Sequence, residues 1–208
     1  MPSKGCPEDL QSHFEALHVS RETMERLEIY ERLLLEWAPR INLVARSTFD
    51  QVWRRHFLDS LQLASHLPKD GEIIADLGSG AGFPGMVLAI HLGCSVTLVE
   101  VDAKKIAFLR TVSRETQTPV RLVQQRIETL ESLQVDVLTS RACAPLELLL
   151  SYAEQHLAMG GTCLFLKGRE VDQEIQKIKD INHLDLQQIP SISDCQGTLL
   201  KIKRTRLA

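Results

Sequence analysis

The spacing of apolar residues predicts that the first third of the chain is helical. Between residues 20 and 37, apolar side chains recur every three or four positions, which places them on one stripe of an amphipathic helix. A shorter helix is predicted to begin at Pro7, because proline suits the first turn of a helix. A third is predicted over residues 48–67, where helical spacing recurs. We therefore expect an N-terminal helical extension over residues 1–70.

After Gly71, short β-type runs alternate with helical patterns. The predicted strands are 73–77, 95–99, 120–123, 135–139, 162–166, 184–189 and 198–203. The predicted helices are 84–92, 103–115 after the cap Asp102, 146–157 and about 171–181. This alternation is typical of a Rossmann-like α/β domain, here residues 71–208, with a mainly parallel seven-stranded sheet between two layers of helices.

The charge of the chain excludes a uniformly basic nucleic-acid binder, because 24 Lys and Arg face 27 Asp and Glu in 208 residues and the net charge is −3. The basic residues are nevertheless gathered locally. Residues 40–56 carry a net +3 and residues 197–208 a net +4, which leaves −10 on the rest of the chain. Such a chain would hold phosphates over a small area and bind bulk RNA poorly. The tail cations Lys201, Lys203, Arg204 and Arg206 are alternatively interpreted as protection of an edge strand.

The cysteines and the apolar runs indicate the compartment of the protein and whether it binds a metal. The five cysteines are odd in number and contain no CxxC pair, so neither a disulfide framework nor a metal site is expected. No run is long enough to cross a bilayer, and the N-terminus lacks the apolar core of a signal peptide. We expect a cytoplasmic protein with no membrane partner.

A glycine-rich loop, DLGSGAGFPG from Asp76 to Gly85, follows an apolar strand and opens a helix. Glycines let a backbone turn tightly and approach a ligand. Gly80, Gly82 and Gly85 satisfy the dinucleotide pattern GxGxxG, whereas Asp76, Gly78, Gly80 and Gly82 match the first motif of class I S-adenosylmethionine-dependent methyltransferases. The strand residue Leu77 directly precedes Gly78, which favours the methyltransferase register. A nicotinamide-binding oxidoreductase and a purely structural turn remain alternatives.

Polar residues follow the other predicted strands at the same edge of the sheet. Glu100 ends the second strand, where a carboxylate can accept both ribose hydroxyls of an adenosine. Residues 125–128 follow the third, where a carboxylate and a backbone N–H can meet an adenine. Arg141 follows the fourth and suits a carboxylate or phosphate better than it suits base chemistry. Nearby Cys143, without an activating partner, is interpreted as a structural thiol.

Seven blocks between Trp37 and Gly168 resemble the RsmG (GidB) family of methyltransferases. They are Ile41-Asn42-Leu43, Arg55-His56-x-Leu58-Asp59-Ser60, the glycine loop, Lys104-Lys105-x-x-Phe108-Leu109, Arg126-Ile127-Glu128, Ser140-Arg141-Ala142 and Lys167-Gly168. The resemblance implies methylation of N7 of guanine 527 in 16S ribosomal RNA by S-adenosyl-L-methionine. It also implies cofactor contacts by Gly78, Phe83, Ile127, Glu128 and Arg141, with Glu100 on the ribose. The chain departs from the family pattern at Val44, where threonine is usual, and at Glu100, where many members have aspartate.

Guanine N7 carries an in-plane lone pair, so direct in-line methyl transfer needs no general base and catalysis is expected from orientation. We expect Arg141 and Lys167 to border the base pocket, and Arg54, Arg55, His56, Lys167 and Arg169 to contact RNA. The competing interpretation pairs His56 with a nearby carboxylate such as Asp59. We expect a monomer acting on free RNA, an assembly intermediate or the 30S subunit. A small-molecule methyltransferase and a non-catalytic adenosine-binding module are the further alternatives.

Overall fold

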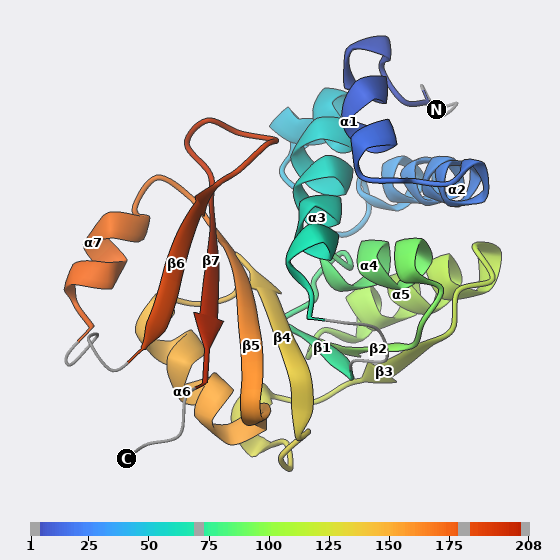
Figure 1. The fold of residues 1–208 in the computed structure, drawn as a ribbon. Coiled ribbons are helices and arrows are strands. Elements are labelled where there is room, and N and C mark those ends of the chain that lie inside the picture. The colour runs from blue at the N-terminus through green and yellow to red at the C-terminus, as the bar shows by residue number, and fades with distance from the viewer. Residues whose placement is uncertain (1–4, 69–72, 179–183, 205–208) are drawn as a thin grey trace.

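The computed structural model describes residues 5–68, 73–178 and 184–204. Figure 1 shows one twisted sheet with helices on both faces and further helices of the N-terminal region above it. The helices and short helical turns are η1 (Glu8–Leu10), α1 (Gln11–Ala16), α2 (Arg21–Trp37), η2 (Arg46–Gln51), η3 (Trp53–Leu58), α3 (Asp59–Leu61), η4 (Gln62–His66), α4 (Gly85–Leu92), α5 (Ala103–Glu115), η5 (Ile127–Thr129), α6 (Leu146–His156) and α7 (Val171–Gln176). The strands are β1 (Ile74–Leu77), β2 (Val96–Val99), β3 (Val120–Val123), β4 (Val135–Arg141), β5 (Leu157–Lys167), β6 (Asp185–Pro190) and β7 (Thr198–Lys203).

The seven strands form one sheet in the order β3-β2-β1-β4-β5-β7-β6. The first five are parallel to one another, whereas β7 is antiparallel to both β5 and β6. The mainly parallel seven-stranded sheet expected from the sequence is therefore confirmed. The interpretation of the basic tail as edge protection is wrong, because β7 lies between β5 and β6 and the edges are β3 and β6. Linear order does not reveal that the final hairpin inserts its second strand inward.

The sheet separates two hydrophobic cores, since successive side chains of a strand point to opposite faces. Leu164 and Leu166 of β5 join the core formed with α1, α2, α4 and α5, while Cys163 and Phe165 join the core under α6 and α7. The N-terminal helices share the first core with the sheet. The expected boundary near residue 70 falls within 69–72, outside the described residues.

The helix predicted over residues 48–67 is not a regular α-helix. The segment 48–67 consists of a 3-10 turn, a π-helical turn over Trp53–Leu58, a short α turn and a further 3-10 turn. A π turn rotates the following side chains relative to a regular α-helix, and such turns are frequent at functional sites. Of the helix predicted over 171–181, the structure describes α7 to Gln176, and residues 179–183 lie outside the described part.

Candidate active site

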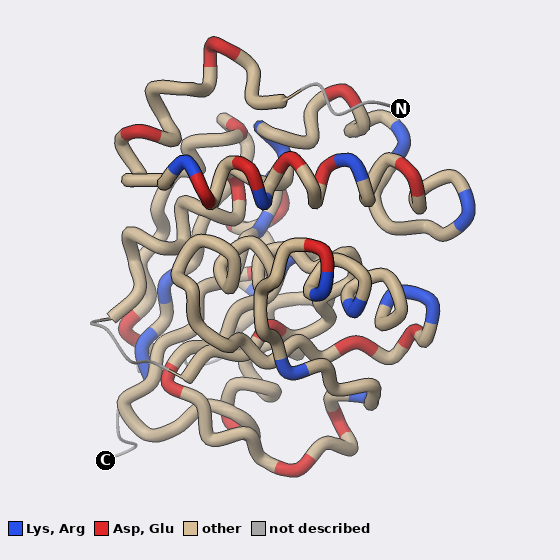
Figure 2. The backbone as a smooth tube through the Cα atoms, turned by 90° about the vertical axis from the view of Figure 1, so that its right-hand side faces the viewer, with Lys and Arg blue, Asp and Glu red and all other residues tan. Residues whose placement is uncertain are grey.

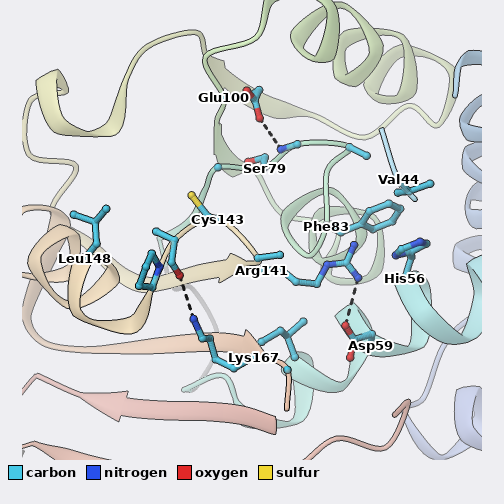
Figure 3. A pocket seen from close by; sticks show the side chains of 18 of the residues that line it. Val44, His56, Asp59, Ser79, Phe83, Glu100, Arg141, Cys143, Leu148 and Lys167 are labelled. Carbon is cyan, nitrogen blue, oxygen red and sulfur yellow. Dashed lines mark hydrogen bonds and ion pairs between the residues drawn. The ribbon is translucent and has the colours of Figure 1, made fainter. Parts of the chain in front are cut away.

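An open cleft of about 1240 Å³ lies at the carboxyl ends of the five parallel strands. Its lining residues include segments directly after each of them: 78–81, 99–101, 125–128, 141–145 and 166–170. Connections leave β1 and β4 toward opposite sides of the sheet, and doubly wound folds bind their ligands at such a switch point. The cleft is therefore the candidate active site, and Figure 3 shows its side chains.

The glycine loop forms one wall of the cleft. Gly78 and Gly80 have φ angles of +65° and +57°, a left-handed conformation that glycine adopts without strain. A Cβ atom on Gly78 would overlap the Cys143 sulfur, so only glycine lets the end of β4 approach the loop this closely. Burial raises the pKa of the Cys143 thiol, which fits the interpretation of a packing residue.

Asp76 and Gly82, two residues predicted to bind the cofactor, do not line the cleft. They support the glycine loop from the side away from the cleft. Asp76 is fully buried and accepts hydrogen bonds from Thr139 Oγ1 (3.0 Å) and Gly85 N (3.3 Å). This burial raises its pKa to about 6. Gly82, with φ of +96°, packs against Tyr30 and Met86, whose side chains a Cβ atom would meet. In this structure Asp76 and Gly82 position the loop, and the loop backbone faces the cleft.

Glu100, 7% exposed, joins the loop to the start of α5. Its Oε2 accepts from Gly80 N (2.9 Å) and its Oε1 from Asp102 N (2.8 Å), and Figure 3 shows the first of these bonds. Each carboxylate oxygen can accept a further hydrogen bond. Helix capping belongs to Asp102, whose carboxylate accepts from the backbone of Lys104 and Lys105 as expected. Glu100 therefore lines the cleft and can accept further hydrogen bonds there.

The short turn η5 after β3 forms another wall of the cleft and is held by α6. The Tyr152 hydroxyl donates to Glu128 (2.6 Å), a bond that lowers the pKa of Glu128. His156 Nε2 lies 3.2 Å from the Ile127 carbonyl, and Gln155 Nε2 donates to the Leu130 carbonyl (2.7 Å). Three side chains of one helix therefore fix the turn.

Arg141 lies in the middle of the cleft, where Figure 3 shows it between Phe83 and Asp59. Its guanidinium carbon lies 4.8 Å from the centre of the Phe83 ring. Its Nη1 donates to the Arg55 carbonyl (2.9 Å) and to Asp59 Oδ2 (3.3 Å). Asp59 Oδ1 accepts from Ser193 (2.6 Å). The interpretation that Asp59 partners His56 is therefore wrong, because Asp59 bonds to Arg141 and Ser193, while His56 bonds to Thr48.

His56 is buried, and its ring stacks on Phe83 with centroids 4.9 Å apart. The Thr48 hydroxyl lies 2.7 Å from the Ala45 carbonyl, to which it gives its one proton, so it accepts from His56 Nε2 at 2.9 Å. Burial, together with the charges of Arg141 and Arg55, lowers the pKa of His56 to about 3. His56 is therefore a neutral ring with its proton on Nε2, which is ill suited to a phosphate contact.

The other basic residues expected to contact RNA differ in their partners. The Lys167 side chain is only 7% exposed and pairs with Glu174 (2.6 Å), while its Nζ also donates to the Ala144 carbonyl (3.1 Å). Arg55 pairs with Asp194 (2.7 Å) at the rim. Arg54 pairs with Asp9 and does not line the cleft. Arg169 is exposed and lines it.

The sequence analysis missed the apolar residues of the cleft. Val101 is 54% exposed and Leu148 is 40% exposed, and both line it. Val101 could have been found from its position, because it directly follows Glu100 at the end of β2. Within the described residues, no three His, Cys, Asp or Glu side chains gather as a metal site requires. No described helix is both long and apolar enough to cross a membrane.

Comparison with known proteins identifies relatives of this chain. The GidB family model, described as rRNA small subunit methyltransferase G, matches residues 23–201. A relative named ribosomal RNA small subunit methyltransferase G, from Paramagnetospirillum magneticum, is 48% identical over 89% of this chain and 90% of its own length. One of the same name from Rhodospirillum centenum is 48% identical over 90% of this chain and 87% of its own.

Solved structures share the fold at low sequence identity. A methyltransferase from Geobacter sulfurreducens aligns with a TM-score of 0.59 at 13% identity, covering 95% of this chain and 98% of its own. A methyltransferase from Pyrococcus furiosus aligns with a TM-score of 0.59 at 19% identity, covering 72% and 83%. The family model covers most of the chain and two relatives are 48% identical over about nine-tenths of it, so the chain belongs to the GidB family of methyltransferases.

Proposed function

We propose that this enzyme transfers a methyl group from S-adenosyl-L-methionine to N7 of guanine 527 in the 16S RNA of the small ribosomal subunit. The names of its relatives support the RNA substrate. The observation that carries the proposal is the cleft itself, which Gly78, Gly80 and Glu100 line together with Phe83, Arg141 and Lys167. The substrate places the enzyme in the cytoplasm.

The first half of the cleft fits the methyl donor. The backbone of Gly78 and Gly80 can approach a ligand closely, and Glu100 retains lone pairs for ribose hydroxyls. The exposed apolar side chains of Val101 and Leu148 suit the faces of a purine. Glu128 can accept from an exocyclic amine. When bound, S-adenosyl-L-methionine supplies an electrophilic methyl group on a positively charged sulfur.

The cleft has room for a second molecule. Its volume of about 1240 Å³ exceeds the range of about 300–1000 Å³ typical of small-molecule sites. Arg141 borders the remaining space with a planar cation, which suits contact with a nucleobase. The buried Phe83 ring, stacked between Tyr30 and His56, supports this guanidinium. The target guanine must be unstacked to enter such a cleft.

The state of the titratable side chains supports a reaction without a general base. His56 already donates through Nε2 and has a pKa of about 3, and burial raises the pKa of Cys143. Asp59 is engaged by Arg141 and Ser193. Because guanine N7 offers a lone pair without losing a proton, these residues need only bind and orient. Well-oriented reacting groups can gain about 7–11 kcal/mol in this way.

The proposal is tested by transfer of a labelled methyl group from S-adenosyl-L-methionine to small-subunit RNA. The RNA is isolated from a strain that lacks this enzyme, and RNA from a strain that contains it is the control. We expect incorporation only into the undermodified RNA. Equal incorporation into both, or none into either the free RNA or the 30S subunit, would contradict the proposal. Calorimetry should show binding of S-adenosylhomocysteine in preference to NAD.

A further inference from the structure

A second, smaller cleft of about 340 Å³ is formed where the segment after α2 meets the start of α5. Its lining residues are Arg40, Ile41, Asn42, Asp102, Lys104 and Lys105. Lys105 also lines the active-site cleft, so the two openings meet at this side chain. The second cleft is therefore placed beside the reaction site and on the same edge of the sheet.

The second cleft is positively charged, with three cations and one carboxylate among its lining residues. That carboxylate, Asp102, already accepts from Lys104 N (2.7 Å) and Lys105 N (3.2 Å), and these backbone bonds lower its pKa. Elsewhere on the side of the molecule seen in Figure 2, positive and negative residues are interspersed. Along α2, for example, Arg21 pairs with Glu25 and Arg26 pairs with Glu22. The cluster is thus a local excess of positive charge on an acidic chain.

The cations of the second cleft are available to a ligand. Over residues 5–68, 73–178 and 184–204, no carboxylate lies within ion-pair distance of Arg40, Lys104 or Lys105, and Arg40 and Lys104 are exposed. By contrast, Arg54, Arg55 and Lys167 are each neutralised by an acidic partner. An anion binding at the second cleft displaces no internal ion pair.

We propose that Arg40, Lys104 and Lys105, together with the exposed amide of Asn42, form a docking surface for the phosphate backbone of the RNA strand that flanks the target guanine. This inference rests on the proposed function, because it takes the target base to lie in the adjoining cleft. Unpaired cations on two elements suit successive phosphates, and the Asn42 amide can donate to phosphate or sugar oxygens. The surface fixes the position of the strand and leaves sequence readout to the active-site cleft.

The test uses the full chain with Arg40→Ala and Lys104→Ala combined. Lys105 is left intact because it lines the active-site cleft. The matched control combines Arg121→Ala and Lys203→Ala, which remove two exposed cations from β3 and β7, outside both clefts. The probe is small-subunit RNA from a strain lacking the enzyme, titrated at several salt concentrations. Binding of S-adenosylhomocysteine is measured in parallel as a check on folding and on the cofactor half.

We expect the double variant to bind RNA about tenfold more weakly and to lose about two units of the slope of log affinity against log salt, one per phosphate contact. KM for RNA should rise, while kcat and S-adenosylhomocysteine binding match the wild type. If the wild type methylates the RNA and the variant keeps its slope and KM, or if the control loses as much, the docking surface is overturned and the proposed function stands. If the slope falls as expected but the wild type transfers no methyl group, the residues bind RNA phosphates, but the proposed function fails and with it the assignment of the surface to the strand that flanks the target guanine.

Discussion

Arg141 at the end of β4 and Asp59 in α3 form an ion pair of 3.3 Å between residues 82 positions apart in sequence. The pair ties the N-terminal helical region to the sheet at the centre of the cleft. Asp59 in turn holds Ser193 of the hairpin that joins β6 to β7. Three segments from different parts of the chain therefore depend on one guanidinium group.

Replacing Arg141 by methionine should destabilise the protein by about 2–3 kcal/mol, below the range for fully buried pairs because both side chains are 17–18% exposed. A double-mutant cycle with Asp59→Asn, followed by urea denaturation, should give a coupling energy of about 1–2 kcal/mol. Additive effects of the two substitutions would show that the ion pair does not join the segments energetically.

Glu100→Gln should weaken cofactor binding more than it weakens folding. An amide oxygen can replace one acceptor, but its NH₂ group would face either Gly80 N or Asp102 N, each of which donates to the carboxylate. The loop must then shift, and we expect S-adenosylhomocysteine to bind about tenfold to a hundredfold more weakly, the range for losing a charged hydrogen bond. Calorimetry measures this. Unchanged affinity would mean that Glu100 does not position the loop for a ligand.

The Tyr152–Glu128 hydrogen bond makes a separate prediction about η5. In Tyr152→Phe, Glu128 loses the donor that orients it, and S-adenosylhomocysteine should bind about fivefold more weakly. Thr111→Val is the matched control, since it removes a hydroxyl that donates to the Ala107 carbonyl within α5, away from both clefts. Equal affinities of the two variants would show that α6 does not set the geometry of the turn.

Asp76 should make stability depend on pH. Burial raises its pKa from 3.8 to about 6 in the folded chain, so between these values the folded state binds the proton more tightly than the unfolded state. The contribution of Asp76 to stability therefore falls as pH rises through this window, by about 3 kcal/mol in total. Because an asparagine side chain does not titrate, urea denaturation of Asp76→Asn should show its stability relative to wild type improving from pH 4 to pH 7. Parallel pH profiles would contradict a buried, titrating Asp76.

Local patterns predicted much of this fold. The cap at Asp102 and the regular apolar spacing after it predict the helix 103–115 with the bounds that α5 has. The run 198–203 likewise has the bounds of β7, but its place inside the sheet depends on pairing with distant β5. Apolar spacing over 48–67 indicates a helix yet does not distinguish α, π and 3-10 turns, because all three leave one face apolar.

The sequence predicted which positions line the candidate site better than it predicted the contacts that these residues make. Strand ends indicated Gly78, Glu100 and Arg141, since parallel strands end at one edge. Which cations are free to bind an anion was beyond the sequence, because partners such as Asp194 for Arg55 come from distant segments. For the same reason the sequence did not separate Asp76, which supports the loop, from residues that line the cleft.

The central claim, transfer of a methyl group to N7 of one guanine, is tested most directly by chemical cleavage of the RNA product. Reduction followed by aniline treatment breaks an RNA strand at 7-methylguanine, and primer extension locates the break. The proposed function predicts one new break, at guanine 527, that depends on both enzyme and S-adenosyl-L-methionine. Methyl incorporation without this break, or breaks at several guanines, would contradict it.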